Sequence, residues 1–241
     1  MQQRQDHDLS LTIDDQLAQI ERLAEAIRAL PEYNAFRAAS RTLYADPGAN
    51  CRMDELPMRL YEARKHHRPL ADDFCGRESV QAYIHAEVHL SELLSLVERV
   101  LSHATGIAFC EDIELETDWA PGQLPPTLRY EVKELGRILA AHPAIRANRE
   151  AESELAADAY ASKIDLRFET LRLQLKAHQR AMEDIRPVDV TTFQELREAV
   201  LANALIEERD RARDEARHYL GRVIESLNRK LGLDFVAMAR G

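Results

Sequence analysis

The sequence of 241 residues has few of the features on which several protein classes depend. Its 3 cysteines all lie in the first half, cannot make a disulfide framework, and fit a reducing compartment. It has no run of about eighteen apolar residues, and its first residues lack the apolar core of a signal peptide. We therefore expect a soluble, cytoplasmic protein without a membrane-spanning segment.

The chain also lacks net positive charge. The formal net charge is −10 and the pI is near 5.4, so the surface is not built to neutralise phosphates, and no direct nucleic-acid binding is expected. The sequence contains no glycine-rich phosphate loop, no nucleophile elbow and no pair of Glu-x-x-His motifs of the di-iron kind. We expect no catalytic residues and interpret the many carboxylates as solvated helix faces.

Helical periodicity is what the sequence does have. It is 45% hydrophobic and 31% charged, with 8 glycines and 6% aromatic residues, a composition typical of helices with charged outer faces. Steps of three and four predict amphipathic helices over residues 14–30, 79–104 and 191–231. The apolar positions of the first two are Leu17, Ile20, Leu23, Ile27 and Leu30, then Tyr83, Ala86, Leu90, Leu93, Val97, Val100 and Ala104. The predicted fold class is all-α, with antiparallel helical hairpins or a bundle and long coiled-coil-like helices.

Two segments in the first half of the sequence are similar to two segments in the second half. Residues 23–46 share nine identities with residues 135–158, and "LLSLVERVLSHATGIAF" at 93–109 matches "YLGRVIESLNRKLGLDF" at 219–235. Such self-similarity predicts an internal duplication. We divide the chain into a first repeat at 12–110, an acidic, proline-rich linker at 111–127 and a second repeat at 128–236.

Prolines and glycines at the expected helix ends support this division. Pro31 and Pro143 lie where one helix ends and the next begins, because proline suits the first turn of a helix. Gly106 and Gly232 follow the last strongly patterned helix of each repeat and suit a helix C-terminal cap.

Two histidines are the first metal-ligand candidates. In "HAEVH", His85 and His89 are at i and i+4 of a predicted helix, with Glu92 one turn further. The zinc-protease pattern needs a glutamate directly after the first histidine, and Glu87 is in the wrong place for it. No third ligand can be named, so we favour histidines that flank the apolar stripe over a metal site.

The cysteines are the second candidates. Cys51, Cys75 and Cys110 contain no C-x-x-C pair, so ordinary thiols are favoured over zinc or iron–sulfur ligands. A metal-binding or redox-sensing helical protein would depend on these cysteines together with His85 and His89.

Two stretches carry a family resemblance: "LAEAIRALPEYNAFRAASRTLYADP" at 23–47 and "VQAYIHAEVHLSELLSLVERVL" at 80–101. Each half of the chain resembles the YlbF/YmcA family of small helical bacterial regulators. The resemblance implies a non-catalytic role through other proteins, notably in a YlbF–YmcA–YaaT complex that supports competence, sporulation and biofilm formation and modulates RNA processing by ribonuclease Y. It also implies an iron–sulfur cluster held by cysteines, but those ligands are not transferred here and no cofactor is assigned.

The function that we expect is therefore that of a cytoplasmic regulator or adaptor that binds other proteins, including a ribonuclease complex. Two repeats on one chain could fold as an intramolecular pseudo-dimer, because a linker gives the second half a high effective concentration. Two alternatives stay open: a structural coiled-coil protein without a regulatory partner, and the metal-binding or redox-sensing protein.

Overall fold

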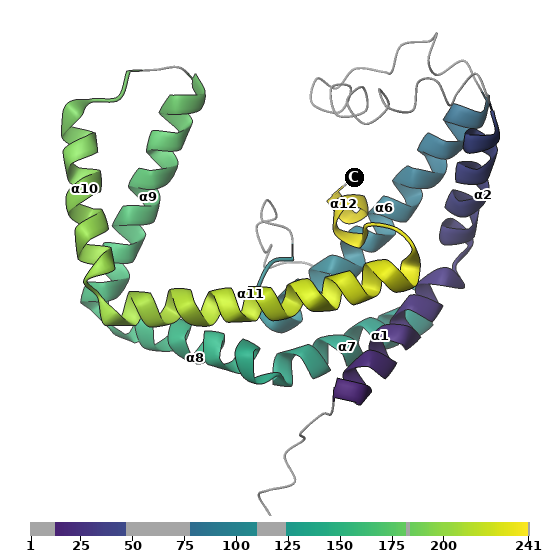
Figure 1. The fold of residues 1–241 in the computed structure, drawn as a ribbon, viewed down its shortest axis with the longest axis horizontal. Coiled ribbons are helices and arrows are strands. Elements are labelled where there is room, and N and C mark those ends of the chain that lie inside the picture. The colour runs from purple at the N-terminus through teal and green to yellow at the C-terminus, as the bar shows by residue number, and fades with distance from the viewer. Residues whose placement is uncertain (1–12, 47–77, 110–123, 182–183, 241) are drawn as a thin grey trace, which may run out of the picture. The chain divides into compact units, whose positions relative to one another are not determined.

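The computed structural model describes residues 13–46, 78–109, 124–181 and 184–240, and within them it is all-α, as predicted (Figure 1). No strand occurs among the described residues. The helices are α1 Ile13–Arg28, α2 Pro31–Ala45, α6 Glu78–Thr105, α7 Pro126–Ala141, α8 Pro143–Ala157, α9 Ala159–Ala181, α10 Pro187–Leu201, α11 Ala204–Leu231 and α12 Phe235–Arg240.

Prolines begin several of the described helices, two of them at Pro31 and Pro143 as the sequence predicts. α2, α8 and α10 each have proline in the first turn, at Pro31, Pro143 and Pro187. The residue before each proline is extended, for example Leu30 with φ −73° and ψ 143°. A residue that precedes proline is pushed out of the helical region, so the chain must bend between the two helices.

Two helices end at a glycine in the left-handed conformation. Gly106 has φ 72° after α6, and Gly232 has φ 66° after α11. Glycine takes this conformation without a side-chain clash, which confirms both predicted caps.

The chain divides into two compact units, of which unit 1 comprises residues 1–138 and 223–241. In unit 1, α6 packs against both α2 and α12, and Phe235 at the start of α12 is fully buried. The hydroxyl of Tyr33 in α2 donates a 2.6 Å hydrogen bond to the carbonyl of Leu231. The apolar stripe predicted for α6 is confirmed: five of its positions are buried, and Tyr83 and Ala104 are half-buried.

α1 departs from its predicted pattern at two positions, one of which is Leu30, half-buried at the start of α2 because α1 already ends at Arg28. Leu17 is exposed, whereas Ile20, Leu23 and Ile27 are buried. The neighbouring Gln19 is buried instead, because its side-chain amide donates to the backbone carbonyl and the carboxylate of Glu131 at 3.0 and 2.7 Å. A buried amide whose N–H groups are satisfied costs little, so a polar residue can take a core position.

Unit 2 comprises residues 139–222, and α8, α9 and α10 pack in sequence order within it. α9 and α10 form an antiparallel hairpin, drawn in green in Figure 1. A small core holds its base, where Ala199, Val200 and Leu205 pack around a buried cluster of Leu155, Ala161, Ile164 and Ile206.

The prediction of one continuous helix over residues 191–231 is wrong, because the helix is interrupted between α10, which ends at Leu201, and α11, which begins at Ala204. Asn203 accepts hydrogen bonds from the backbone N–H groups of Leu205 and Ile206, at 3.1 and 3.3 Å. An asparagine that caps the first turn starts a new helix, a signal that the periodicity concealed. The small residues Ala212 and Ala216 are buried in the charged middle of α11.

Two helix lengths recur along the described chain. α2 and α8 each have 15 residues, and α6 and α11 each have 28. The predicted linker lies mostly outside the described residues, and the proposed repeats and their boundaries stay predictions. No helix in the described part of the chain is long and apolar enough to cross a membrane.

Candidate functional site

His85 and His89 are brought together on the exposed side of α6. Their Nε2 atoms are 3.2 Å apart, and the ring centroids are 4.4 Å apart with planes at 73°. The carboxylate of Glu92 lies 3.7 Å from Nδ1 of His89. Both histidines flank the buried positions Ala86 and Leu90, as predicted.

The other metal-ligand candidates, Cys51, Cys75 and Cys110, lie outside the described residues. Among the residues that the structure does describe, no group of three or more histidine, cysteine, aspartate or glutamate side chains is placed to hold a metal ion. The histidine pair therefore supplies at most two ligands from the described chain.

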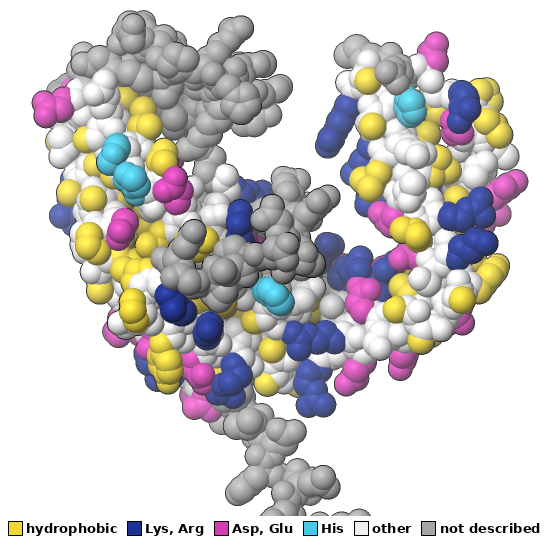
Figure 2. Space-filling view, turned by 180° about the vertical axis from the view of Figure 1, so that it is seen from behind, with side chains coloured by type: hydrophobic (Ala, Val, Ile, Leu, Met, Phe, Trp, Pro, Cys, Tyr) yellow, Lys and Arg dark blue, Asp and Glu magenta, His cyan; other side chains and the backbone are white. Residues whose placement is uncertain are grey.

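The histidine pair borders a groove of about 1370 Å³ between α2 and α6. Small side chains, among them Ala35 and Ala39 of α2 and Ala82 and Ala86 of α6, line the groove and leave it open. Hydrophobic and acidic side chains lie around histidines on this face of unit 1 (Figure 2).

A second candidate site is the hairpin of α9 and α10 in unit 2. Six of the ten large hydrophobic residues that are exposed in the described chain belong to it: Tyr160, Leu166, Leu173, Val188, Val190 and Leu201. α10 has no buried residue, and α9 buries only Ala161 and Ile164. Figure 2 shows the hydrophobic side chains of this hairpin among basic and acidic ones.

The two helices of the hairpin still pack on each other. Phe168 of α9 and Phe193 of α10 stack with ring centroids 5.2 Å apart and planes at 21°. The hairpin therefore has one face that holds it together and a second face that exposes Leu166 and Leu173, seven residues and two turns apart on α9.

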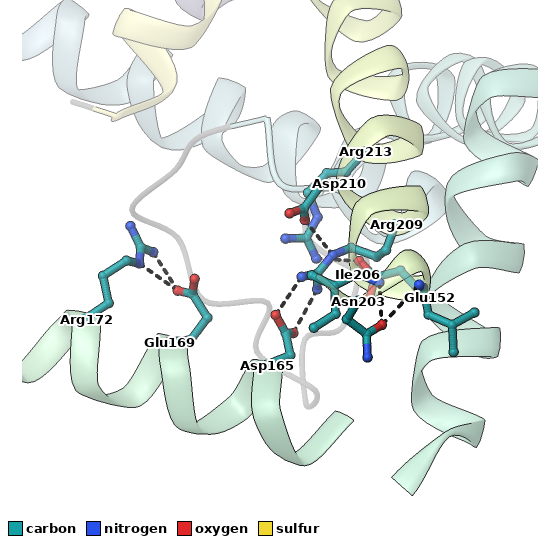
Figure 3. A network of polar contacts seen from close by, with 10 residues as sticks. Glu152, Asp165, Glu169, Arg172, Asn203, Ile206, Arg209, Asp210 and Arg213 are labelled. Carbon is teal, nitrogen blue, oxygen red and sulfur yellow. Dashed lines mark hydrogen bonds and ion pairs between the residues drawn. The ribbon is translucent and has the colours of Figure 1, made fainter. Parts of the chain in front are cut away.

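An arginine of α11 fixes the base of the hairpin (Figure 3). Arg209 points at Asp165 of α9 and donates two hydrogen bonds to its carboxylate, from Nη1 at 2.9 Å and Nη2 at 2.7 Å. Its Nε donates to Asp210 at 2.7 Å, and Arg213 pairs with Glu152 of α8. Bidentate pairing fixes orientation as well as distance, so Arg209 holds the start of α9 in one orientation against α11.

Burial makes this ion pair different from the others on the surface. The Arg209 side chain is 7% exposed and that of Asp165 is 17% exposed. Burial alone would lower the pKa of Arg209, but the hydrogen bonds and charge of Asp165 outweigh it and raise the pKa above its usual value. The guanidinium therefore stays charged at every accessible pH.

His142 occupies another polar position in unit 2, at the start of α8. Its Nδ1 accepts a 3.2 Å hydrogen bond from the N–H of Ala144, and its ring stacks on Tyr219 with centroids 3.5 Å apart. Burial, and then the charge of Arg222, lower the pKa of His142. A neutral ring suits this cap, because Nδ1 accepts a hydrogen bond only while it is unprotonated.

Sequence reasoning missed Arg209 and Asp165, although the sequence does carry a signal for one of them. Arg209 lies three residues after Ile206 and three before Ala212, so it belongs to the buried stripe of α11. A charged residue on a buried stripe needs a partner, but which carboxylate supplies it depends on the tertiary packing.

Comparison with known proteins gives a match to a family model. No curated protein and no solved structure matches the chain. Residues 129–232, which include the hairpin and Arg209, match the model of a family described as "Control of competence regulator ComK, YlbF/YmcA", and this segment is therefore similar to that family of regulators.

Proposed function

We propose that the chain is a non-catalytic cytoplasmic regulator that binds other proteins, and that the exposed face of the α9–α10 hairpin is its partner-binding surface. The observation that carries this proposal is the concentration of exposed apolar side chains on two helices that bury almost nothing. The hairpin also lies inside the segment that matches a family of regulators.

Exposed apolar side chains gathered on one element are characteristic of protein interfaces. When a partner covers exposed leucine and tyrosine side chains, the removal of apolar surface from water stabilises the complex by about 25 cal/mol for each Å². The pair of Arg209 and Asp165 anchors the base of the hairpin on α11, so this end of the surface is ordered before a partner binds.

The resemblance supplies candidate partners for this surface. The matched family is described by its control of the competence regulator ComK. From the resemblance of the sequence motifs to the YlbF/YmcA family we further propose that the partner is a regulatory protein complex that contains a ribonuclease, and that the processes affected are RNA processing, competence, sporulation and biofilm formation.

We also propose that the two repeats form an intramolecular pseudo-dimer. Gln19 and Glu131 are 112 residues apart, the same offset that aligns α2 with α8, and they are in contact. A contact between equivalent positions of two copies is what a twofold axis between the copies produces. Light scattering of residues 1–123 and 124–241, expressed separately, should show that they bind each other.

The alternative of a structural coiled-coil protein loses its main support. It depended on one long helix over residues 191–231, and the structure divides that segment at Asn203. We therefore retain the regulator as the proposed function.

The test is purification of the tagged full chain from its native host, followed by mass spectrometry of the proteins that accompany it. The variant is Leu166→Ser with Leu173→Ser, which removes apolar area from the hairpin at positions 69% and 59% exposed. Substitutions at exposed positions change stability by less than about 0.5 kcal/mol each, so the fold should persist.

The matched control is Leu17→Ser, which removes an exposed leucine from α1 in unit 1. We expect a partner that is recovered with the wild type and with the control but not with the hairpin variant. Equal recovery with all three chains would refute the assignment of the hairpin as the binding surface.

A further inference from the structure

We propose that His85 and His89 form a chelating site for one late first-row divalent transition ion, such as Zn²⁺, on the outer face of α6. This inference is independent of the proposed function. It depends on the separation of the two ring nitrogens, on the group behind one of the rings, and on the position of the pair beside the α2–α6 groove.

The separation of the nitrogens is the first observation. Two nitrogens bound at about 2.0–2.1 Å to one ion, at a right or a tetrahedral angle, are about 2.8–3.4 Å apart. The Nε2 atoms of His85 and His89 are 3.2 Å apart. Both rings are exposed, so they can rotate to aim their lone pairs at one ion, and the spacing of four residues on α6 keeps them on one side of the helix.

The group behind His89 is the second observation. A histidine that binds metal through one ring nitrogen usually presents its other N–H to a carboxylate or a carbonyl. In this chain Nε2 of His89 faces His85, and Nδ1 faces the carboxylate of Glu92 at 3.7 Å. That distance is too long for a hydrogen bond, but the negative charge of Glu92 beside Nδ1 favours the tautomer with its proton on Nδ1 and a free lone pair on Nε2, which is the atom that must bind the ion.

The donor set indicates the kind of ion. Imidazole nitrogens suit zinc, copper and nickel, whereas magnesium and calcium prefer oxygen ligands. The described part of the chain offers no third ligand at this place, so the described residues supply two ligands and leave the remaining positions of the ion to water or to another molecule. A two-histidine site of this kind binds reversibly and leaves coordination positions open.

The histidine pair lies at the edge of the α2–α6 groove, so a bound ion would change the charge of that groove. His85 and His89 line the same groove as Ala82 and Ala86, so a bound ion would add a positive charge with open coordination positions to the edge of the groove. It would also tie two successive turns of α6 together through the side chains.

The test is calorimetric titration of the full chain with Zn²⁺ alone. Because thiolates also bind zinc, every measurement is made in a chain with Cys51→Ser, Cys75→Ser and Cys110→Ser. We expect one ion per chain, with a large loss of affinity in His85→Gln and in His89→Gln. The loss should be at least about 100-fold, because substitutions of outer-sphere groups alone cost about 10–100-fold.

Two further variants distinguish this site from general zinc binding by an acidic protein. Glu92→Gln should weaken binding by about tenfold, as expected for a group that orients a ligand. His103→Gln, an exposed histidine in the last turn of the same helix, should leave the affinity unchanged. The inference is overturned if zinc does not bind the serine-substituted chain, or if it binds with the same affinity after His85 or His89 is replaced.

Discussion

Replacement of Arg209 by alanine is the sharpest test of how the hairpin is held. The substitution removes two hydrogen bonds from the carboxylate of Asp165 and leaves that carboxylate without its charge partner at the base of α9. Removal of one partner from a buried ion pair costs about 3–5 kcal/mol. Because Asp165 is 17% exposed, water can replace part of the lost interaction, and we expect a loss of about 2–3 kcal/mol in the free energy of unfolding.

The measurement is urea denaturation followed by circular dichroism, with thermal unfolding alongside it. For a chain of this size the expected loss corresponds to a decrease in Tm of roughly 4–12 °C. Arg211→Ala is the matched control, because Arg211 pairs with Glu208 on the surface at 65% exposure and should change stability by less than about 0.5 kcal/mol.

The double variant Arg209→Met with Asp165→Leu separates two explanations of the loss. If the cost arises from an unpaired buried charge, replacement of both partners by apolar residues should recover most of the stability. The reasoning is refuted if Arg209→Ala is no more destabilising than Arg211→Ala.

Three further predictions concern local packing, pH and helix capping. Gly136→Ala should destabilise the chain, because the added Cβ would lie 2.7 Å from the Cβ of Ala104. Gly221→Ala should stabilise the chain by about 1 kcal/mol, because its added Cβ would have no neighbouring atom within 4 Å and alanine favours the helix more than glycine. Urea denaturation of both variants measures the two effects. The lowered pKa of His142 predicts that its contribution to stability is complete above about pH 6.5 and decreases at lower pH, because the unfolded chain binds the proton more tightly than the folded chain. Between about pH 8 and about pH 5 the free energy of unfolding, measured by urea denaturation, should therefore depend less on pH in His142→Asn, which keeps a capping side chain. Asn203→Ala should cost about 1 kcal/mol by removal of the α11 cap, and an Asn203→Asp variant that is equally destabilised would contradict the capping role.

The sequence predicted the parts of the fold that depend on local signals. Periodicity of three and four located α6 to within one residue at each end, and the prolines and glycines located the starts of α2 and α8 and the ends of α6 and α11. These signals act within a few residues of the chain, so tertiary structure does not alter them.

The sequence could not predict features that depend on distant contacts. The apolar stripe of α1 suggested a buried Leu17, but the side chain that is buried is Gln19, because Glu131 of α7 supplies its hydrogen-bond acceptors. In the same way Arg209 reads as one charge among many in α11 until Asp165 is placed beside it. Polar residues enter a core only with a partner, and the partner is set by packing.

The candidate sites follow the same division. The i and i+4 spacing of His85 and His89 was visible in the sequence, and the structure places their ring nitrogens within reach of one ion. The exposed face of the hairpin was not visible in the sequence, because only the structure shows that α9 and α10 leave apolar side chains such as Leu166 and Leu173 outside the face on which the two helices pack.

Hydrogen exchange of the chain, alone and in the complex purified from its host, tests the central claim most directly. The amide protons of residues 159–201 report on the α9–α10 hairpin, which buries little and should exchange readily in the free chain. The account predicts that exchange in this segment slows in the complex, more than in α1 or α2. Unchanged exchange in the hairpin, with protection elsewhere in the described helices, would contradict it.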